Sequence, residues 1–449
     1  MLWRAPWLRD RALLVVLAGL DALIILTVYS SVLSIRTGTT GLPGNGAIIA
    51  SIGWVFISYI LGRYSKDETS EDQQLERRSA LSACGASAAM LTLFVLHSWA
   101  YQVVNAETRV RGFLVPTFLM VTVILALTGY ATRRTRKGKD KQWLIVCTEE
   151  EESVIRSEAT RDKIENLSFC RPEGAAKAMS RSPAVNVAVG GILRLKADEA
   201  YRFARVRANG KQICQVTDWC ERELHRVPPE LISSDWLIFS DGFAIQPGRV
   251  WWRIKRLGDV VLASALLIAT SPVVAVAMLM IRIEERGPVF YKQMRTGIYG
   301  SKIIIWKLRS MKTNAEKSGA RWAQRDDPRI TKVGKILRKT RIDELPQLIN
   351  VISGELSLIG PRPERPEIEE QLEELIPYYR AREWVRPGLS GWAQVSYPYG
   401  ASVEDARMKL SYELYYLRNA GFFLDLLILL KTIKLVARAE GSAPESRSR

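Results

Sequence analysis

The chain has 449 residues, of which 47% are hydrophobic, and a formal net charge of +17. At roughly 100–200 residues per domain, this length leaves room for two or three units, and the charge favours anionic partners such as lipid headgroups, nucleotides or phosphates. The basic residues lie beside hydrophobic segments, and neither zinc-finger spacing nor a basic-aromatic ribbon occurs, so nucleic acid is not an expected partner.

The positions of cysteine and histidine limit the chemistry. Five cysteines at irregular spacing include no C-x-x-C pair, which argues against a disulfide framework and favours cytosolic soluble parts. The histidines are His97 and His225, and neither residue type occurs after position 225. An active site within residues 250–449 therefore cannot be a Ser-His, Cys-His or His-ligated zinc site. It would have to use carboxylates, lysines, hydroxyls and hard metals.

Four apolar stretches open the chain, each close to the ~20 residues that cross a bilayer. They lie at about residues 12–34, 46–62, 80–98 and 113–130. Basic residues before the first and after the fourth predict that both ends face the cytoplasm. We therefore expect a four-helix transmembrane bundle over residues 1–135, which weakly favours a homo-oligomer. A cleaved signal peptide is the alternative for the first stretch, but its apolar core is too long. Asp21 lies inside that stretch and is either functional or structural.

Residues 136–248 are predicted to form a degenerate Rossmann-like soluble domain. Short β-like runs alternate with helical patterns in a βαβ rhythm. The runs are Trp143–Cys147, Val185–Val189 and Gln212–Val216. No G-x-G-x-x-G follows the first run, so dinucleotide binding has no support. A structural or regulatory spacer is the favoured role, and a nucleotide sensor is the alternative.

A further apolar run, Val260–Ile283, has Ser271 and Pro272 at its centre. Proline removes an intrahelical hydrogen bond and kinks or breaks a helix, and basic residues on both flanks favour both ends on one side of the membrane. We therefore expect a re-entrant helix over about residues 259–283, broken at Ser271-Pro272. A straight span is the alternative, and it would carry the following residues out of the cytoplasm. A later apolar helix, Phe422–Val436, is too short and too charged to span.

The densest cluster of chemically useful side chains surrounds Asp343 and Glu344. Asp343 is expected to cap a helix that runs to about Ser353, and helix N-termini bind phosphates readily. Arg338 and Arg341 can grip phosphate oxygens, and Glu344 supplies a second carboxylate for Mg²⁺. These groups suit attack on a phosphorus atom by Asp343. The alternative is an ordinary helix cap followed by a surface acid.

Other nearby groups could contact an anion. The runs Val289–Gln293 and Lys302–Leu308 predict a hairpin, and the basic amphipathic helix Lys332–Thr340 suits a membrane surface or solvent. Prolines hold Arg362 in a preset direction. The candidate substrate-binding residues in these segments are Arg295, Lys302, Lys307, Arg309, Pro361, Arg362 and Pro363. The polar tail 441–449 is expected to be disordered.

These clusters occur in one order along the chain. In that order, residues 251–440 resemble the bacterial sugar transferase family, the monotopic phosphoglycosyl transferases. The matching stretches are Lys255-Arg256-x-x-Asp259, Ser271-Pro272, Gly287–Gln293, Trp306–Met311, Asp327–Thr331, Arg341–Gln347, Gly354–Pro363 and Arg386–Val395. The departures are mild: Trp306 stands where the family often has Phe, and Ser310 and Ser390 where it often has Thr. The front portion also resembles the family's large forms, such as undecaprenyl-phosphate galactose and glucose phosphotransferases, by arrangement more than by motif.

The resemblance implies an α/β catalytic domain over residues 249–440 that acts on a UDP-sugar and polyprenyl phosphate. Asp343 would attack the β-phosphate, expel UMP and carry the phosphosugar covalently until the lipid phosphate takes it. Glu344 would help to hold Mg²⁺ beside Asp343, Arg338 would contact phosphate, and Pro361-Arg362-Pro363 would shape the uridine pocket.

The same resemblance implies a place and a pathway. The enzyme would lie in the bacterial inner membrane with its catalytic domain on the cytoplasmic face, and it would initiate exopolysaccharide, capsule or O-antigen synthesis. Two alternatives stay open: a direct inverting glycosyltransferase, which releases UDP instead of UMP, and a non-catalytic membrane scaffold or regulator of polysaccharide assembly.

Overall fold

The computed structural model describes residues 6–37, 45–61, 83–96, 113–134, 142–181, 186–191, 197–208, 213–239, 250–313, 327–397, 400 and 402–437. Contacts divide the chain into two units, Met1–Asp140 and Lys141–Arg449. The predicted domain boundaries at 135/136 and 248/249 and the tail 441–449 fall outside the described residues, so they stay predictions.

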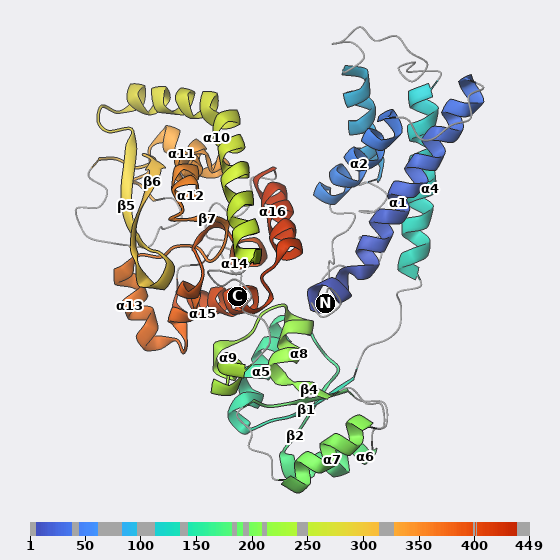
Figure 1. Ribbon diagram of the computed structural model, residues 1–449, viewed down its shortest axis with the longest axis vertical. Helices are drawn as coiled ribbons and strands as arrows, with labels where there is room; N and C mark the ends of the chain where they lie inside the picture. Colours follow the sequence, from blue (N-terminus) through green and yellow to red (C-terminus); the bar gives the residue numbers. More distant parts are fainter. Residues whose placement is uncertain are drawn as a thin grey trace. The chain divides into compact units, whose positions relative to one another are not determined.

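The first unit is helical where it is described. Its helices are α1 (Pro6–Thr37), α2 (Asn45–Ile60), Ala83–Leu96 and α4 (Val115–Arg134) (Figure 1). Each overlaps one of the four predicted apolar stretches. Within this unit's described residues, only Val15–Ile35 is long and apolar enough to cross a membrane; the apolar lengths described in the other three helices are shorter.

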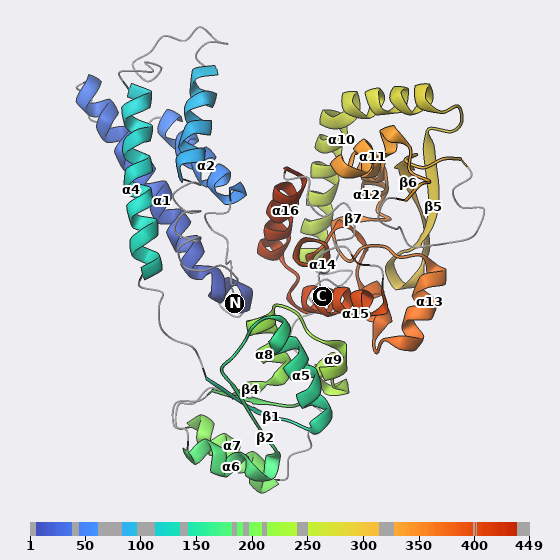
Figure 2. The same cartoon turned by 180° about the vertical axis from the view of Figure 1, so that it is seen from behind.

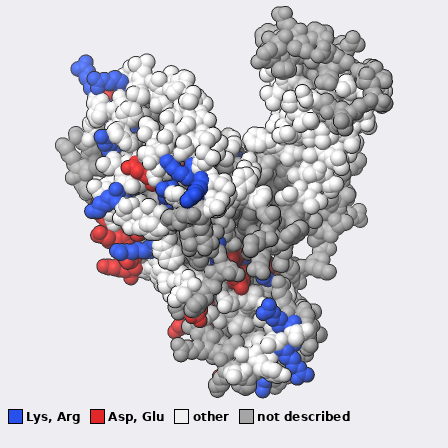
Figure 3. Space-filling model, viewed as in Figure 1, with Lys and Arg blue, Asp and Glu red and all other residues white. Residues whose placement is uncertain are grey.

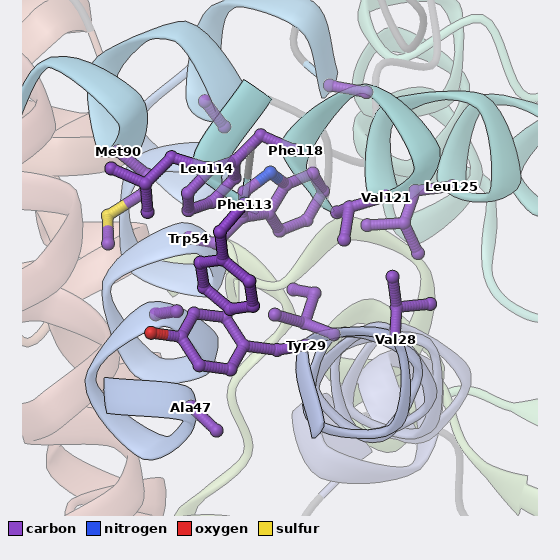
Figure 4. Close-up of a cluster of buried hydrophobic side chains, with 14 residues drawn as sticks. Val28, Tyr29, Ala47, Trp54, Met90, Phe113, Leu114, Phe118, Val121 and Leu125 are labelled. Atoms are coloured by element: carbon purple, nitrogen blue, oxygen red, sulfur yellow. The ribbon is translucent and has the colours of Figure 1, made fainter. Parts of the chain in front are cut away.

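Aliphatic and aromatic side chains together form the core of this unit (Figure 4). The ring of Tyr29 in α1 meets Phe113 edge-on, with 4.9 Å between centroids. Trp54 in α2 is fully buried, and its Nε1 donates to Ser87 Oγ at 3.0 Å. Such pairing satisfies the polar atom of a buried aromatic ring. Asp21 is fully buried in α1 as well.

The second unit begins with a four-stranded parallel sheet in the order β2-β1-β3-β4 (Figure 2). The predicted βαβ rhythm is confirmed, but β2 was not predicted. In chain order the elements are β1 (Trp143–Val146), α5 (Glu149–Arg161), β2 (Leu167–Cys170), α6 (Pro172–Arg181), β3 (Asn186–Val189), α7 (Ala197–Ala208), β4 (Ile213–Gln215), α8 (Val216–Trp219) and α9 (Ser234–Phe239).

The turn after β1 is acidic. Thr148 caps α5 through a reciprocal capping box with Glu151, which satisfies two backbone N–H groups that the helix leaves unpaired. Four glutamates, Glu149 to Glu152, occupy the first helical turn. Acids stabilise this end of a helix, and the same charge disfavours a phosphate there.

Helix α10 (Val250–Glu284) carries both Ser271 and Pro272. The sequence predicted a broken helix, but the structure has one continuous helix that bends within its length (Figures 1 and 2). Pro272 offers no N–H to the Ile268 carbonyl, and the Ser271 hydroxyl donates to that carbonyl at 2.8 Å instead. The freed backbone acceptor is thereby satisfied, which allows proline inside an apolar helix.

Many side chains along α10 are apolar and exposed, and the exposed fraction of Ile268 is 74%. Figure 3 shows a broad uncharged surface over the bent part of this helix. By length and composition α10 is the second candidate membrane helix in the described residues.

The remaining elements pack against both arms of α10 and around a hairpin (Figure 1). The predicted hairpin is confirmed, with β5 antiparallel to β6, and β7 pairs with β8 in parallel. The elements are β5 (Phe290–Thr296), β6 (Lys302–Leu308), α11 (Lys332–Thr340), α12 (Leu348–Ser353), β7 (Ser357–Ile359), α13 (Pro366–Leu375), β8 (Gly388–Ser390), α14 (Trp392–Ser396), α15 (Val403–Asn419) and α16 (Phe422–Ala437).

Helix α15 joins the sheet-bearing part of this unit to the hairpin-bearing part. Arg226 is 1% exposed and pairs with Glu158 of α5 at 2.7 Å. From the other side, Arg407 of α15 reaches the same carboxylate at 2.6 Å, and the Val227 amide donates to the Ser411 carbonyl at 2.9 Å. These buried contacts hold the two parts together.

Candidate active site

Asp343 and Glu344 lie in a 3₁₀ turn, Ile342–Gln347, between α11 and α12. The sequence predicted Asp343 as the cap of a helix to Ser353, and the structure corrects this. Arg341 adopts a left-handed conformation with φ 58°, ends α11 and begins the tighter turn. Both carboxylates therefore lie in the first turn of the 3₁₀ segment, close to its unpaired N–H groups.

Glu344 is held by three cations. Lys307 Nζ lies 3.2 Å from Glu344 Oε1, Arg362 bonds the same oxygen, and Arg341 Nη1 lies 3.6 Å from Oε2. Burial alone would raise the pKa of Glu344, but Arg362 and Lys307 outweigh it and hold that pKa well below its usual value. Glu344 is therefore anionic at neutral pH.

Asp343 lies in the same cluster, but its pKa is shifted in the opposite direction. It is 8% exposed. Burial, together with the neighbouring charge of Glu344, raises the pKa of Asp343 to about 6, against the opposing effect of Lys307, Arg338 and Arg362. Two adjacent carboxylates whose pKa values diverge are typical of functional sites.

The proline-rich segment after β7 is fixed through its backbone. The Pro361 carbonyl accepts a hydrogen bond from the Gly388 amide, and the Arg362 carbonyl accepts one from Arg382 Nη2. The Pro363 carbonyl accepts from Arg295 Nη1, and the Glu364 carbonyl accepts from the Thr296 amide. The distances are 2.7, 2.7, 3.2 and 3.0 Å. Four consecutive anchored carbonyls leave little freedom to the backbone that presents Arg362 to Glu344.

The predicted residues divide into those at the acidic pair and those away from it. Lys307, Arg362 and Arg338 lie at the pair, and Arg338 Nη1 is buried with no hydrogen-bond partner in the described part of the chain. Arg295 supports the proline segment. Lys302 is exposed at the far end of β6, and its odd spacing from Lys307 puts it on the opposite face of the strand.

Arg309 has a structural position. Its Nη2 donates to the Glu285 carbonyl at 2.6 Å, just beyond the end of α10, and its side chain closes against Gly287. The φ of Gly287 is 142°, a conformation that a side chain would strain. Arg309 thus fixes the chain as it leaves α10.

Arg382 is a residue that sequence reasoning missed. It is 6% exposed and forms a fork with Glu413 of α15 at 2.9 and 3.0 Å, while its Nη2 also holds the Arg362 carbonyl. Its partners come from distant parts of the chain, so no local pattern signals them. A second pair, Asp327 and Arg329, lies in one quoted motif, where hydrogen bonds from Arg329 lower the pKa of Asp327 to about 2.

The acidic pair fits Mg²⁺ by donor type. No group of three or more His, Cys, Asp or Glu that could hold a metal occurs in the described residues. Mg²⁺ does not require one, because it commonly binds through one or two carboxylates, several waters and substrate phosphates. Asp343 and Glu344 would supply the carboxylates.

Known proteins match the part of the chain that contains the acidic pair. Residues 250–439 match the family model described as bacterial sugar transferase. The chain is 42% identical over 199 residues to the UDP-N-acetylgalactosamine-undecaprenyl-phosphate N-acetylgalactosaminephosphotransferase of Aeromonas hydrophila, covering 44% of this chain and 47% of that protein.

Two UDP-glucose:undecaprenyl-phosphate glucose-1-phosphate transferases are also similar. That of Escherichia coli (strain K12) is 39% identical over 182 residues, covering 40% of this chain and 39% of that protein. That of Caulobacter vibrioides is 40% identical over 181 residues, covering 40% of this chain and 68% of that protein. The match thus spans less than half the length of the first two relatives.

Proposed function

This chain belongs to the bacterial sugar transferases, and from that membership we propose that it transfers a sugar-1-phosphate from a UDP-sugar to undecaprenyl phosphate. The observation that carries the proposal is the pair Asp343–Glu344, whose carboxylates are buried among Lys307, Arg338 and Arg362. An anionic nucleophile surrounded by cations suits displacement at a diphosphate.

The reaction proceeds in two displacements. A carboxylate oxygen of Asp343 attacks the β-phosphorus of the UDP-sugar, and the bond from that phosphorus to the bridging oxygen breaks, so UMP leaves. Asp343 then carries the sugar phosphate as an acyl phosphate. An oxygen of the lipid phosphate attacks the same phosphorus, the bond to Asp343 breaks, and the product is undecaprenyl-diphospho-sugar. Two steps allow one site to treat a soluble and a membrane substrate in turn.

The surrounding residues have separate tasks. Glu344 keeps Lys307 and Arg362 oriented, and with Asp343 would hold Mg²⁺, which when bound neutralises charge on the diphosphate. Arg338, whose buried Nη1 has no hydrogen-bond partner among the described residues, contacts a phosphate oxygen. The anchored segment Pro361-Arg362-Pro363 shapes the uridine side of the site.

The same proposal places the molecule in the bacterial inner membrane. The bend of α10, the hydrogen bond from Ser271 to the Ile268 carbonyl and the apolar exposed surface support a re-entrant helix that enters and leaves on the cytoplasmic side. The helices of the first unit support a multi-pass anchor. The parallel sheet with an acidic turn in place of a glycine-rich loop supports a degenerate Rossmann-like domain that holds no dinucleotide.

The test is the identity of the released nucleotide. Detergent-purified protein is incubated with Mg²⁺, undecaprenyl phosphate and a panel of UDP-sugars. Release of UMP from one of them is expected, together with its loss when Mg²⁺ is chelated. Release of UDP would point to direct glycosyl transfer, and release of neither by folded protein would support a scaffold.

A further inference from the structure

The N-terminal arm of α10 lines a pocket that contains neither Asp343 nor Glu344. Its walls come from α10, the connection between β5 and β6, β7, the segment before β8 and α15, and its volume is about 20 Å³. The charged and aromatic lining residues are Trp252, Lys255, Arg256, Asp259, Arg386 and Tyr416. Three cations face one carboxylate, so the lining carries an excess of positive charge.

Two of the three cations are already engaged. Lys255 Nζ pairs with Asp425 of α16 at 2.7 Å. Arg256 donates from Nη1 and Nη2 to the Val351 and Ile352 carbonyls at 2.5 and 2.7 Å, at the C-terminal end of α12. These bonds fix the pocket wall and supply donors to carbonyls in the last turn of α12, where a helix end has few of its own.

Arg386 differs from these two. Its guanidinium lies over the ring of Trp252, 4.6 Å from the centroid, and within the described residues no carboxylate lies within ion-pair distance of it. The charge of Asp259 raises the pKa of Arg386. The two carboxylate oxygens of Asp259, however, already accept hydrogen bonds from Ser357 Oγ and the Leu358 amide. Burial and the nearby Arg256 lower the pKa of Arg386, so an anion bound here would relieve an unfavourable charge.

The surroundings are apolar and aromatic. On α10, Ile254 and Leu257 are 52% and 66% exposed, and at the start of α16 Phe422 is 55% exposed. Trp251 meets Phe422 edge-on, with 6.1 Å between centroids. Tryptophan and basic residues next to exposed apolar side chains are typical of the level of lipid headgroups.

We propose that this pocket binds the phosphate group of an anionic membrane phospholipid, with Arg386 as the donor fork and the apolar side chains beside it against the acyl chains. A guanidinium grips two phosphate oxygens at once. The apolar flank favours a lipid-borne phosphate over a soluble one. The bound lipid would be a non-reacting ligand, because the acidic pair does not line the pocket. The proposal does not depend on the reaction assigned to Asp343.

Binding of a short-chain lipid to the delipidated full chain in detergent tests this. Dihexanoyl-phosphatidylglycerol is expected to bind, and Arg386→Gln to weaken its binding by about tenfold or more, the usual effect of losing hydrogen bonds to a charged group. Arg386→Lys keeps the charge without the fork and should fall between. Arg253→Gln is the matched control, because Arg253 is an exposed cation of the same helix that does not line the pocket.

Four results would overturn the proposal. If Arg386→Gln and Arg253→Gln weakened lipid binding equally, the binding would be due to general surface charge and not to this pocket. Equally tight binding of dihexanoyl-phosphatidylcholine would remove the need for an anion, and equally tight binding of inorganic phosphate would remove the lipid. Preferential binding of farnesyl phosphate, lost in Arg386→Gln, would assign the pocket to the acceptor substrate. Thermal unfolding of each variant shows whether it is folded.

Discussion

Asp343 and Glu344 are neighbours in the sequence, yet their surroundings shift their pKa values in opposite directions. Glu344 takes the cations Lys307, Arg341 and Arg362 as direct partners. Asp343 is buried beside that carboxylate and keeps a less stable negative charge. A strongly paired carboxylate is a poor nucleophile, whereas a partly desolvated one is better suited to attack.

The rate of sugar-phosphate transfer should therefore depend on pH through Asp343. Its pKa of about 6 lies above the ordinary value, and only the ionised form attacks. Turnover should be constant above pH 7 and fall about tenfold per unit below pH 6. Arg338→Gln removes a cation that lowers this pKa, so its acid limb should move to higher pH. If the acid limb of the pH–rate profile lay near pH 4 and did not move in Arg338→Gln, its assignment to Asp343 would be contradicted.

Arg382 should act as a positioning residue through the carbonyl of Arg362. Arg382→Lys keeps one charge but cannot hold Glu413 and that carbonyl together, so the proline segment loosens. We expect KM for the UDP-sugar to rise by roughly tenfold to a hundredfold, the usual range for hydrogen bonds of a charged group, with a smaller change in kcat.

Arg226→Lys is the matched control for this variant, because Arg226 is equally buried in a carboxylate pair but has no contact with the proline segment. It should lower the melting temperature without raising KM. Equal losses of stability in both variants, with KM unchanged in both, would leave Arg382 a purely structural role.

At the scale of elements, sequence patterns predicted secondary structure correctly where the structure of a segment depends mainly on its own residues. The helix Lys332–Thr340 was predicted with the bounds that α11 has, since its apolar residues share one face. The hairpin β5–β6 was predicted because glycines separate two apolar runs. The helix cap at Asp343 was wrong, because Arg341 takes a left-handed conformation that usually signals glycine or asparagine. The edge strand β2 was missed because its residues are short of β-branched side chains.

The bend of α10 leads to a prediction about topology. In sealed membrane vesicles of one orientation, cysteines placed at Arg253 and at Ser301, in a background without the native cysteines, should react with a membrane-impermeant reagent from the same side. Basic residues flank both ends of this helix, and Pro272 prevents it from running straight. Labelling from opposite sides would establish a straight span and contradict the re-entrant helix.

At the scale of the second unit, long-range ion pairs decide how its two parts meet. The contacts of Arg226 and Arg407 with Glu158 join residues about 70 to 250 positions apart, and no periodicity in the sequence reveals them. The order of the parallel sheet likewise depends on pairing between distant strands. The sequence therefore indicated the kinds of parts and, by resemblance, the chemistry expected of them, but not their contacts.

These contacts should make the two parts unfold together. Arg226→Ala leaves Glu158 buried with one cation fewer, which costs about 3–5 kcal/mol. Hydrogen exchange of the amides in β1 and in α15 should accelerate to the same extent. Faster exchange in β1 alone would show that the sheet-bearing part is an independent unit joined loosely to α15.

The central claim is that Asp343 carries the sugar phosphate. The most direct measurement is the mass of the peptide containing Asp343 after the protein is incubated with its UDP-sugar and Mg²⁺, without undecaprenyl phosphate, and quenched in acid. An added mass of one hexose phosphate (or its N-acetylated form) on Asp343 is expected, with an equal amount of UMP. The adduct should disappear when the lipid is added and be absent in Asp343→Asn. Undiminished turnover of Asp343→Asn, or an adduct on another residue, would contradict it.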